Sequence, residues 1–181
     1  MNAKECIESR RSIRKFKADT VPAEVLGKIV ETARFAPSWK NAQTARYHVI
    51  TNPELKEKLA TDCVCGFAFN TKTLLNAPVM VVLSYVTGRC GYERDGSFTT
   101  SKEDRWEMFD AGIAAQTFCL AAHDFGIGTC IMGIFDEEKI AEALNLPEGQ
   151  KVGAVIAAGY ADIAPDAPPR KETDVLLTYY N

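Results

Sequence analysis

A cluster of cationic side chains follows a predicted helix at the start of the chain. Arg10, Arg11 and Arg14, together with the hydroxyl of Ser12, are groups that bind phosphate oxygens well. Guanidinium groups form bidentate, charge-assisted hydrogen bonds, and a hydroxyl adds a further one. A phosphate site is one interpretation and a solvated basic surface is the other. A nucleic-acid-binding arm is disfavoured, because Phe16 is the only interleaved aromatic residue and the net charge is -3.

A second polar segment, residues 36–43 (APSWKNAQ), ends a predicted helix. It presents the hydroxyl of Ser38, the indole of Trp39 and the amide of Asn41 directly after Pro37. Amides and backbone groups donate and accept hydrogen bonds together, as recognition of the edge of a flat heterocycle requires. A plain helix-terminating loop is the alternative interpretation.

Glycines punctuate residues 126–133 (GIGTCIMG), yet no nucleotide-binding fingerprint is present. The third glycine comes two positions too late for the dinucleotide-binding pattern, and the segment follows a helix rather than a strand. Gly133 is followed by Ile134, which excludes a P-loop. The glycines are therefore expected to allow a tight helix-to-strand turn and close approach of the backbone to a ligand.

The C-terminal tail, residues 161–181, contains Pro168, Pro169, Arg170 and Lys171. Two cations on a proline-stiffened tail could close over the same anion as the first cluster, or they could simply increase solubility. The tail cannot form a core of its own, so we expect it to lie along another surface, such as a partner subunit.

No acid–base or metal-binding motif is evident. Gly-x-Ser-x-Gly and His-Glu-x-x-His are missing, the six cysteines contain no Cys-x-x-Cys pair, and the chain has only two histidines. We therefore expect no metal site, and reduced cysteines that act mostly as small buried hydrophobes. Binding groups without catalytic machinery favour an enzyme whose cofactor carries the reaction.

Hydrophobic periodicity predicts a single domain spanning residues 1–181, of α+β or mixed α/β class. Hydrophobic residues make up 46% and charged residues 25% of the chain, which is ordinary globular composition. The apolar runs are too short to span a bilayer and the N-terminus has no secretory signal, so we expect a cytoplasmic protein that binds neither membrane nor nucleic acid.

The expected elements alternate between helices and about four strands. Helices are predicted over 2–9, from Pro22 until Pro37 ends the second, from 53, from a Ser101/Asp104 capping box through 123, and from Asp136 to about 146. Strands are predicted over 46–51, 78–86, 127–132 and 152–158, and a mobile loop over 87–100.

Taken together, these segments resemble the nitroreductase family of FMN-dependent oxidoreductases. The shared order is R-R-S-x-R-x-F, a helix beginning at Pro22, A-P-S-x-x-N-x-Q, G-x-G-T-x-x-x-G, a D-E-E helix and a P-R-K tail, and it covers essentially the whole chain. The resemblance implies an intertwined homodimer with a mostly antiparallel sheet and two FMN molecules at the interface. The helix through residues 106–122 would then form the core of the dimer.

Each candidate residue acquires a role from this resemblance. The phosphate and ribityl chain of FMN would be held by Arg10, Ser12 and Arg14, with Arg11 nearby and Arg170 completing the site. The isoalloxazine would face three groups of residues: Pro37, Ser38, Trp39 and Asn41 from the partner subunit; Asn70; and the backbone of Ile131, Met132 and Gly133. The cation beside the N1 side of the ring stays open between Lys72 and Arg14.

The implied reaction is ping-pong reduction, by NADH or NADPH, of a nitroaromatic, quinone or similar small-molecule acceptor at flavin N5. No protein side chain is assigned a catalytic role. A non-catalytic FMN-binding protein for storage or sensing is the alternative. Neither the physiological acceptor nor the choice between NADH and NADPH follows from the sequence.

Overall fold

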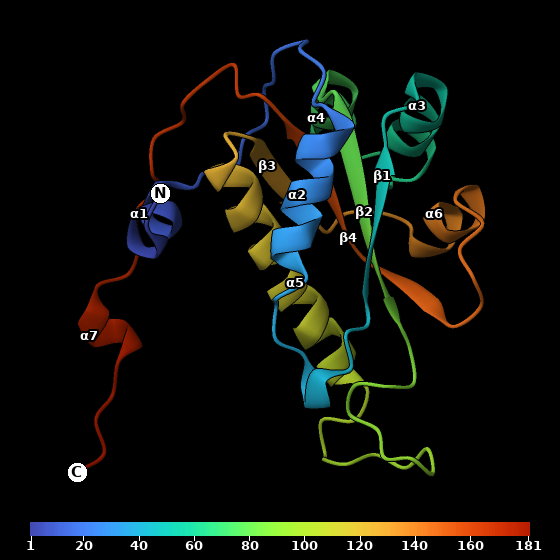
Figure 1. Ribbon diagram of the computed structural model, residues 1–181, viewed down its shortest axis with the longest axis vertical. Helices are drawn as coiled ribbons and strands as arrows, with labels where there is room; N and C mark the ends of the chain where they lie inside the picture. Colours follow the sequence, from blue (N-terminus) through green and yellow to red (C-terminus); the bar gives the residue numbers. More distant parts are fainter.

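One four-stranded antiparallel sheet, in the order β1-β2-β4-β3, forms the centre of the computed structural model, which describes residues 1–181 (Figure 1). The expected α+β class with about four mostly antiparallel strands is confirmed. The two central strands are rich in β-branched residues and buried on both faces, as expected of strands covered by helices. The strands are β1 (Ala45–Ile50), β2 (Val79–Val86), β3 (Gly128–Met132) and β4 (Gln150–Gly159).

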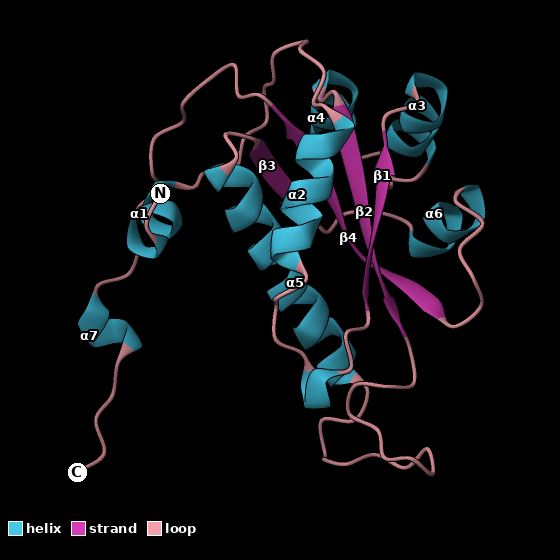
Figure 2. Ribbon diagram, in the orientation of Figure 1, coloured by secondary structure: helices cyan, strands magenta, loops and turns pink.

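Seven α-helices and one 3-10 helix surround the sheet (Figure 2). Three of the helices begin where a side-chain oxygen of Asn2, Asn52 or Asp136 accepts a backbone N–H of the first turn, which stabilises a helix N-terminus. The α-helices are α1 (Ala3–Ser9), α2 (Ala23–Ala33), α3 (Pro53–Asp62), α4 (Ala68–Asn76), α5 (Arg105–Asp124), α6 (Glu137–Ala143) and α7 (Thr173–Leu176), and the 3-10 helix is η1 (Trp39–Asn41).

Two apolar cores lie on opposite faces of the sheet. Helices α2 and α5 pack on one face, where Ile29 and Phe118 are fully or almost fully buried with Leu83 of β2. Helices α3, α4 and α6 cover the other face, where Leu59, Leu74 and Ile140 fill the second core. The sheet is therefore packed on both faces, and the segments that connect its strands lie at the surface, where binding sites usually form.

Several predicted helix boundaries were wrong. Pro22 is the N-cap of α2 rather than its first residue, and α2 ends at Ala33, before Pro37. The Ser101/Asp104 capping box does not form: α5 begins at Arg105, and the Asp104 side chain makes no capping hydrogen bond. Helices α4 and α7 were not predicted, and α6 ends at Ala143.

The segment expected to be a mobile loop, residues 87–100, folds back on itself. Tyr92 and Phe98 form an antiparallel bridge, and their ring centroids lie 4.9 Å apart. The Glu93 N–H donates to the Ser97 carbonyl at 2.8 Å. Gly91 has a φ of 90° and passes so close to the Glu103 carbonyl that a side chain would clash there. We call residues 87–104 the hairpin loop.

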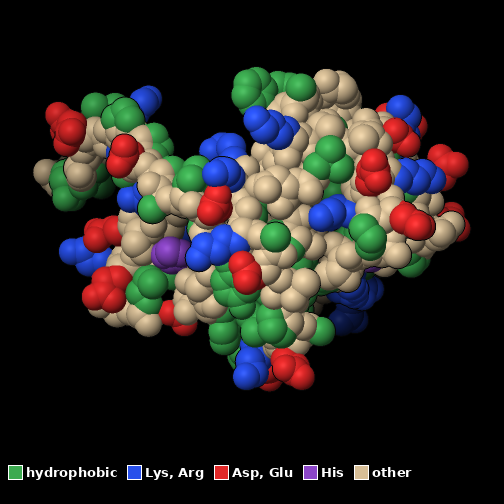
Figure 3. Space-filling model, turned by 90° about the horizontal axis from the view of Figure 1, so that it is seen from above, with side chains coloured by type: hydrophobic (Ala, Val, Ile, Leu, Met, Phe, Trp, Pro, Cys, Tyr) green, Lys and Arg blue, Asp and Glu red, His purple; other side chains and the backbone are tan.

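The C-terminal tail projects from the body of the molecule (Figure 3). None of the residues of α7 is buried, and Leu176, Tyr179 and Tyr180 are all strongly exposed. No helix of the structure combines the length and the apolar character that crossing a membrane requires.

Candidate functional site

Residues 10–17, which we call the first basic segment, lie along the outer edge of β3. Ser12 forms a parallel bridge with Thr129, whose carbonyl accepts the Ile13 N–H at 2.9 Å. The side chains of Ile13 and Phe16 are buried and anchor the segment to the second core. The polar residues near these two anchors are not buried: Arg10, Arg11 and Ser12 are half-buried, and Arg14 is exposed.

The arginines of this segment have no carboxylate partners. Lys15 does have one, because its ammonium lies 2.7 Å from Asp162. The guanidinium of Arg11 donates to the Glu8 and Arg10 carbonyls, and that of Arg14 reaches only the Ser12 carbonyl at 3.4 Å. These contacts leave most of their donors free for an anion.

Arg10 and Arg14 act on the same part of β3. Burial raises the pKa of the Cys130 thiol, and the positive charges of Arg14 and Arg10 oppose that rise. Arg10 also opposes the burial-driven rise in the pKa of Cys119 on α5. Both guanidinium groups therefore lie near Cys130, in the middle of β3, and create a positive potential at this edge of the sheet.

The end of β3 and the start of α4 join this region. Ile131 and Gly133 are exposed, whereas the Met132 side chain is buried in the second core. The buried amide of Asn70 donates to the Ile134 carbonyl at 3.1 Å, which fixes the start of α4 beside residues 131–133. The structure thus brings the first basic segment, the end of β3 and Asn70 to one edge of the sheet.

The segment Pro37–Asn41 lies elsewhere, below the C-terminal end of α2 in Figure 1 and away from the first basic segment at the β3 edge. Its backbone is unusual, because Lys40, Asn41 and Gln43 have φ values of 45°, 55° and 50°. Left-handed backbone costs a residue other than glycine about 1–2 kcal/mol. Such conformations persist only where the surroundings enforce them, and they cluster at functional sites.

Four contacts hold this strained turn in place. The Gln43 N–H donates to the Ser38 hydroxyl at 2.9 Å, and the Trp39 N–H donates to the Asp110 carboxylate of α5 at 2.7 Å. The Trp39 ring packs on Trp106 with centroids 4.8 Å apart, and the Lys40 ammonium pairs with Glu93 of the hairpin loop at 2.9 Å. The indole N–H of Trp39 is buried and has no acceptor within the chain.

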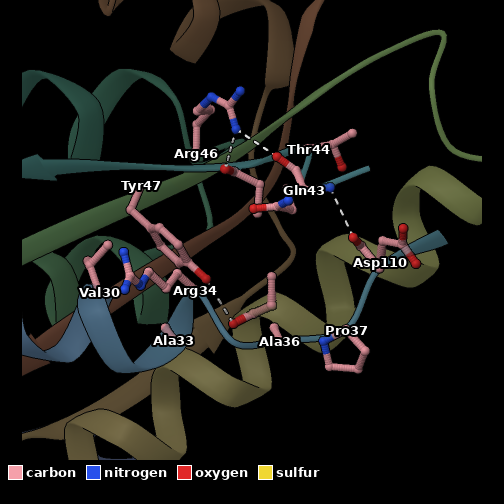
Figure 4. A pocket seen from close by; sticks show the side chains of 13 residues that line it. Val30, Ala33, Arg34, Ala36, Pro37, Gln43, Thr44, Arg46, Tyr47 and Asp110 are labelled. Carbon is pink, nitrogen blue, oxygen red and sulfur yellow. Dashed lines mark hydrogen bonds between the residues drawn. The ribbon is translucent and has the colours of Figure 1, made fainter. Parts of the chain in front are cut away.

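A cavity of about 320 Å³ opens beside this turn (Figure 4). Its apolar lining comes from α2, β1 and α5, and the Tyr47 hydroxyl is occupied by a hydrogen bond to the Ala114 carbonyl. Arg34 and Arg46 also line the cavity, and Arg46 donates to the carbonyls of Gln43 and Ala45. Residues 36–38 and 43–44, on either side of the strained turn, line the cavity.

The tail does not bring Arg170 to the first basic segment. Its guanidinium donates only to the carbonyls of Pro168 and Pro169, at 3.2 and 3.5 Å. Lys72 is exposed and lies two positions beyond the buried Asn70 on α4, so the two side chains point to different sides of the helix.

Asp110 was not predicted from the sequence, and the role expected of Gly128 differs from the one it has in the structure. The signal for Asp110 was an acidic residue within an otherwise apolar helix, where a carboxylate must have hydrogen-bond donors. Gly128 was expected to allow close approach to a ligand, but a side chain there would meet Ile13 at 2.6 Å, so its role is to seat the first basic segment.

A sequence model described as the nitroreductase family matches residues 7–160. The chain belongs to the nitroreductase family. Nitroreductases are oxidoreductases, and the match spans both the first basic segment and all four strands. The resemblance found in the sequence motifs is therefore confirmed.

Individual relatives agree with the family assignment. A protein of Methanothermobacter thermautotrophicus, whose name combines NADH dehydrogenase and NAD(P)H nitroreductase, is 30% identical over 164 residues, which cover 88% of this chain and 78% of that protein. A nitroreductase family protein from Clostridium novyi superposes with a TM-score of 0.77 at 30% identity, over 92% of this chain and 89% of that one.

A third relative was solved with a ligand. A structure from Desulfovibrio desulfuricans, determined in complex with FMN, has a TM-score of 0.77 and 23% identity, and covers 100% of this nitroreductase chain and 99% of its own. At this identity the likeness establishes the shared fold.

Proposed function

We propose that this nitroreductase is an FMN-dependent enzyme that uses NADH or NADPH to reduce nitroaromatic, quinone or similar acceptors in a ping-pong reaction. The observation that carries the proposal is the set of arginines along β3 that lack carboxylate partners. A dianionic phosphate is the natural counter-ion for two or three guanidinium groups beside a hydroxyl. The FMN in the Desulfovibrio relative supports this choice of ligand.

The residues along the β3 edge suit FMN in a definite order. Arg10, Ser12 and Arg14 would hold the phosphate, with Arg11 beside them. Arg170, which contacts only carbonyls of the tail, would have to move to close over it. The exposed backbone of residues 131–133 would run beside the isoalloxazine, and the buried Asn70 fixes the start of α4 next to it. Arg14, rather than Lys72, suits the cationic role near the ring, because Arg14 lies on the β3 edge.

The other wall of the site would come from a second subunit. Within one chain the turn at Pro37–Asn41 lies away from the basic edge, so it would reach the isoalloxazine of a partner rather than its own. The buried indole N–H of Trp39, at this turn, has no acceptor within its own chain. An exposed stripe on α5 that includes Phe109 supplies apolar surface for a homodimer.

Bound FMN would accept a hydride from NAD(P)H at N5 and pass reducing equivalents to the acceptor. The protein's part is to bind and orient. The arginines would hold the phosphate end, the exposed backbone of residues 131–133 would lie beside the ring, and the partner's turn would face it. Orientation of this kind lowers the barrier by placing reacting atoms within reach.

The visible absorbance spectrum of the purified protein, before and after anaerobic addition of NADH and of NADPH, tests the proposal. Flavin bands that bleach with either nucleotide are the expected result, and recovery on adding a quinone or nitroaromatic would complete the cycle. A protein that stays colourless after incubation with FMN would overturn the assignment. FMN that binds but resists both nucleotides would favour storage or sensing.

A further inference from the structure

A buried carboxylate on α5 connects two segments that are distant in sequence. Asp110 is only 6% exposed, and its Oδ2 atom accepts two hydrogen bonds. The Trp39 N–H donates to it at 2.7 Å, and the Cys90 thiol donates at 3.0 Å. One oxygen atom thus joins the turn at Pro37–Asn41 to the start of the hairpin loop.

The thiol is a permanent donor in this arrangement. Cys90 is fully buried, and burial together with its hydrogen bond to Asp110 raises the pKa of its thiol to about 12. The Thr44 hydroxyl lies 3.6 Å from the same sulfur and continues the connection into β1. Protonated at neutral pH, Cys90 keeps the hairpin loop attached to Asp110.

The turn needs this support because its backbone is strained. Lys40, Asn41 and Gln43 are all left-handed, and they follow directly on the residue that Asp110 holds. The Ser38–Gln43 hydrogen bond closes the turn internally, but it does not fix the turn to the body of the protein. The Asp110–Trp39 hydrogen bond is the backbone contact that does so (Figure 4 shows Asp110 among the residues that line the cavity).

We propose that Asp110 is a positioning residue that sets residues 38–41 at the correct depth against the flavin of the partner subunit and couples that turn to the hairpin loop. The proposal rests on the proposed function. It implies that the geometry of flavin reduction depends on a carboxylate that touches neither the flavin nor either substrate, because it acts through the Trp39 backbone.

Glu107 provides a matched control. It lies on the same helix, three residues before Asp110, and is equally buried at 5% exposure. Its carboxylate accepts the Gly88 N–H at 2.6 Å, so it holds the hairpin loop but not the turn. Glu107→Gln and Asp110→Asn make the same chemical change at the same depth, and only the second weakens the hold on the turn.

The test compares FMN-loaded wild type, D110N and E107Q. Two measurements report on the flavin: the rate constant of anaerobic flavin reduction by NADPH or NADH, and the visible circular dichroism of the bound FMN. D110N should lower the rate constant at least ~10-fold and change the visible spectrum, since small misplacements of reacting groups have effects of this size. E107Q should keep both values within about twofold of wild type, because its charge-assisted bond reaches only the loop.

A third measurement, the KM for an electron acceptor, reports on the hairpin loop. The KM for a quinone acceptor should change in E107Q and also in Cys90→Ala, which detaches the loop from Asp110 but keeps the bond to Trp39. Cys90→Ala should leave flavin reduction unchanged. If D110N fails to fold, Asp110→Ser, which keeps an uncharged acceptor, carries the same expectation.

Either of two results would overturn the proposal: wild-type flavin reduction and visible dichroism in D110N, or equal losses in D110N and E107Q. Both are distinct from failure of the proposed function, in which the wild type itself would bind no FMN or would not be reduced by either nucleotide.

Discussion

Among the cations of the first basic segment, position alone decides which are available to a ligand. Lys15 is held by Asp162, whereas Arg10 and Arg14 face the same stretch of β3 without an acidic partner. In the sequence these residues look equivalent. Because Ile13 and Phe16 are buried, the polar residues between them take fixed positions at the surface. The difference between the paired Lys15 and the unpaired arginines can be tested directly.

Arg10→Ala should raise the dissociation constant for FMN about 10- to 100-fold, because a hydrogen bond between charged groups contributes about 1.5–3 kcal/mol. Isothermal titration of apoprotein with FMN measures it. Lys15→Ala removes an equal charge from the same segment and should change the constant less than about twofold, since Lys15 already has a partner. Wild-type affinity in both Arg10→Ala and Arg170→Ala would refute the phosphate assignment.

At this scale the sequence predicted residues that bind through their own side chains. Arg10, Ser12 and Arg14 stand out by type and spacing. Asp110 could not be identified as a site residue, because its partners are a backbone N–H and a thiol that lie 71 and 20 positions away. Contacts of this kind depend on how the elements pack against one another, and the residue types alone do not reveal that packing.

Elements with strong local signals were predicted well. The apolar, β-branched run of β2 and the Asn52–Pro53 start of α3 need no tertiary information. Helix α4 was missed because its sequence has no clear apolar stripe, and it is held by tertiary contacts such as those of Asn70 and Asn76. The hairpin loop was missed because its anchors, Glu107 and Asp110, lie on another element.

Contact between β3 and the first basic segment depends on the absence of a side chain at Gly128. An alanine there would place its Cβ 2.6 Å from Ile13. Gly128→Ala should therefore lower the free energy of unfolding by about 1–3 kcal/mol, the usual range for overpacking. Urea denaturation followed by far-ultraviolet circular dichroism gives the value.

Gly133→Ala is the matched control for this substitution, because its added methyl group would meet nothing within 4 Å. It should leave the free energy of unfolding almost unchanged. Combining Gly128→Ala with Ile13→Ala should lower the free energy of unfolding by less than the sum of the two single losses, since the smaller side chain vacates the contact. A fully stable Gly128→Ala single variant would show that β3 and the first basic segment do not pack this closely.

For the molecule as a whole, the first half of α5 exposes two large apolar side chains, Met108 and Phe109. Phe109 is 58% exposed, so Phe109→Glu should place charges in the proposed homodimer interface and dissociate it. Sedimentation velocity should show a species of half the wild-type mass, with FMN lost because the site needs both subunits.

The same substitution at Val49, on the edge strand β1, serves as the control for Phe109→Glu, because Val49 is also exposed but belongs to a different element. Val49→Glu should remain dimeric and retain FMN. A wild-type protein that sediments as a monomer while holding FMN would contradict the shared site.

The stability of the chain should fall as the pH drops below about 6.5. Burial lowers the pKa of both histidines, His48 and His123, so the unfolded chain binds more protons than the folded one in this range. The stability is fully present above the unfolded pKa and is lost as the pH falls toward the lowered folded pKa. Thermal melts at about pH 7.5 and about pH 5.5 measure the loss.

The double variant His48→Gln/His123→Gln should show a smaller loss over the same pH interval, since glutamine does not titrate. An identical pH dependence in wild type and double variant would mean that carboxylates, rather than the two histidines, account for it.

The pairing of the first basic segment with β3 and with Ala161, just after β4, has a consequence for synthesis. Ser12 bridges Thr129, and Phe16 bridges Ala161, so each partner is translated more than a hundred residues later. Pairing across such separations is slow and cannot begin until the later strand exists. On the ribosome, the arginines emerge first but must wait as an unpaired basic stretch until nearly the whole chain has been made. Competence to take up cofactor is thus among the last properties that the growing chain acquires.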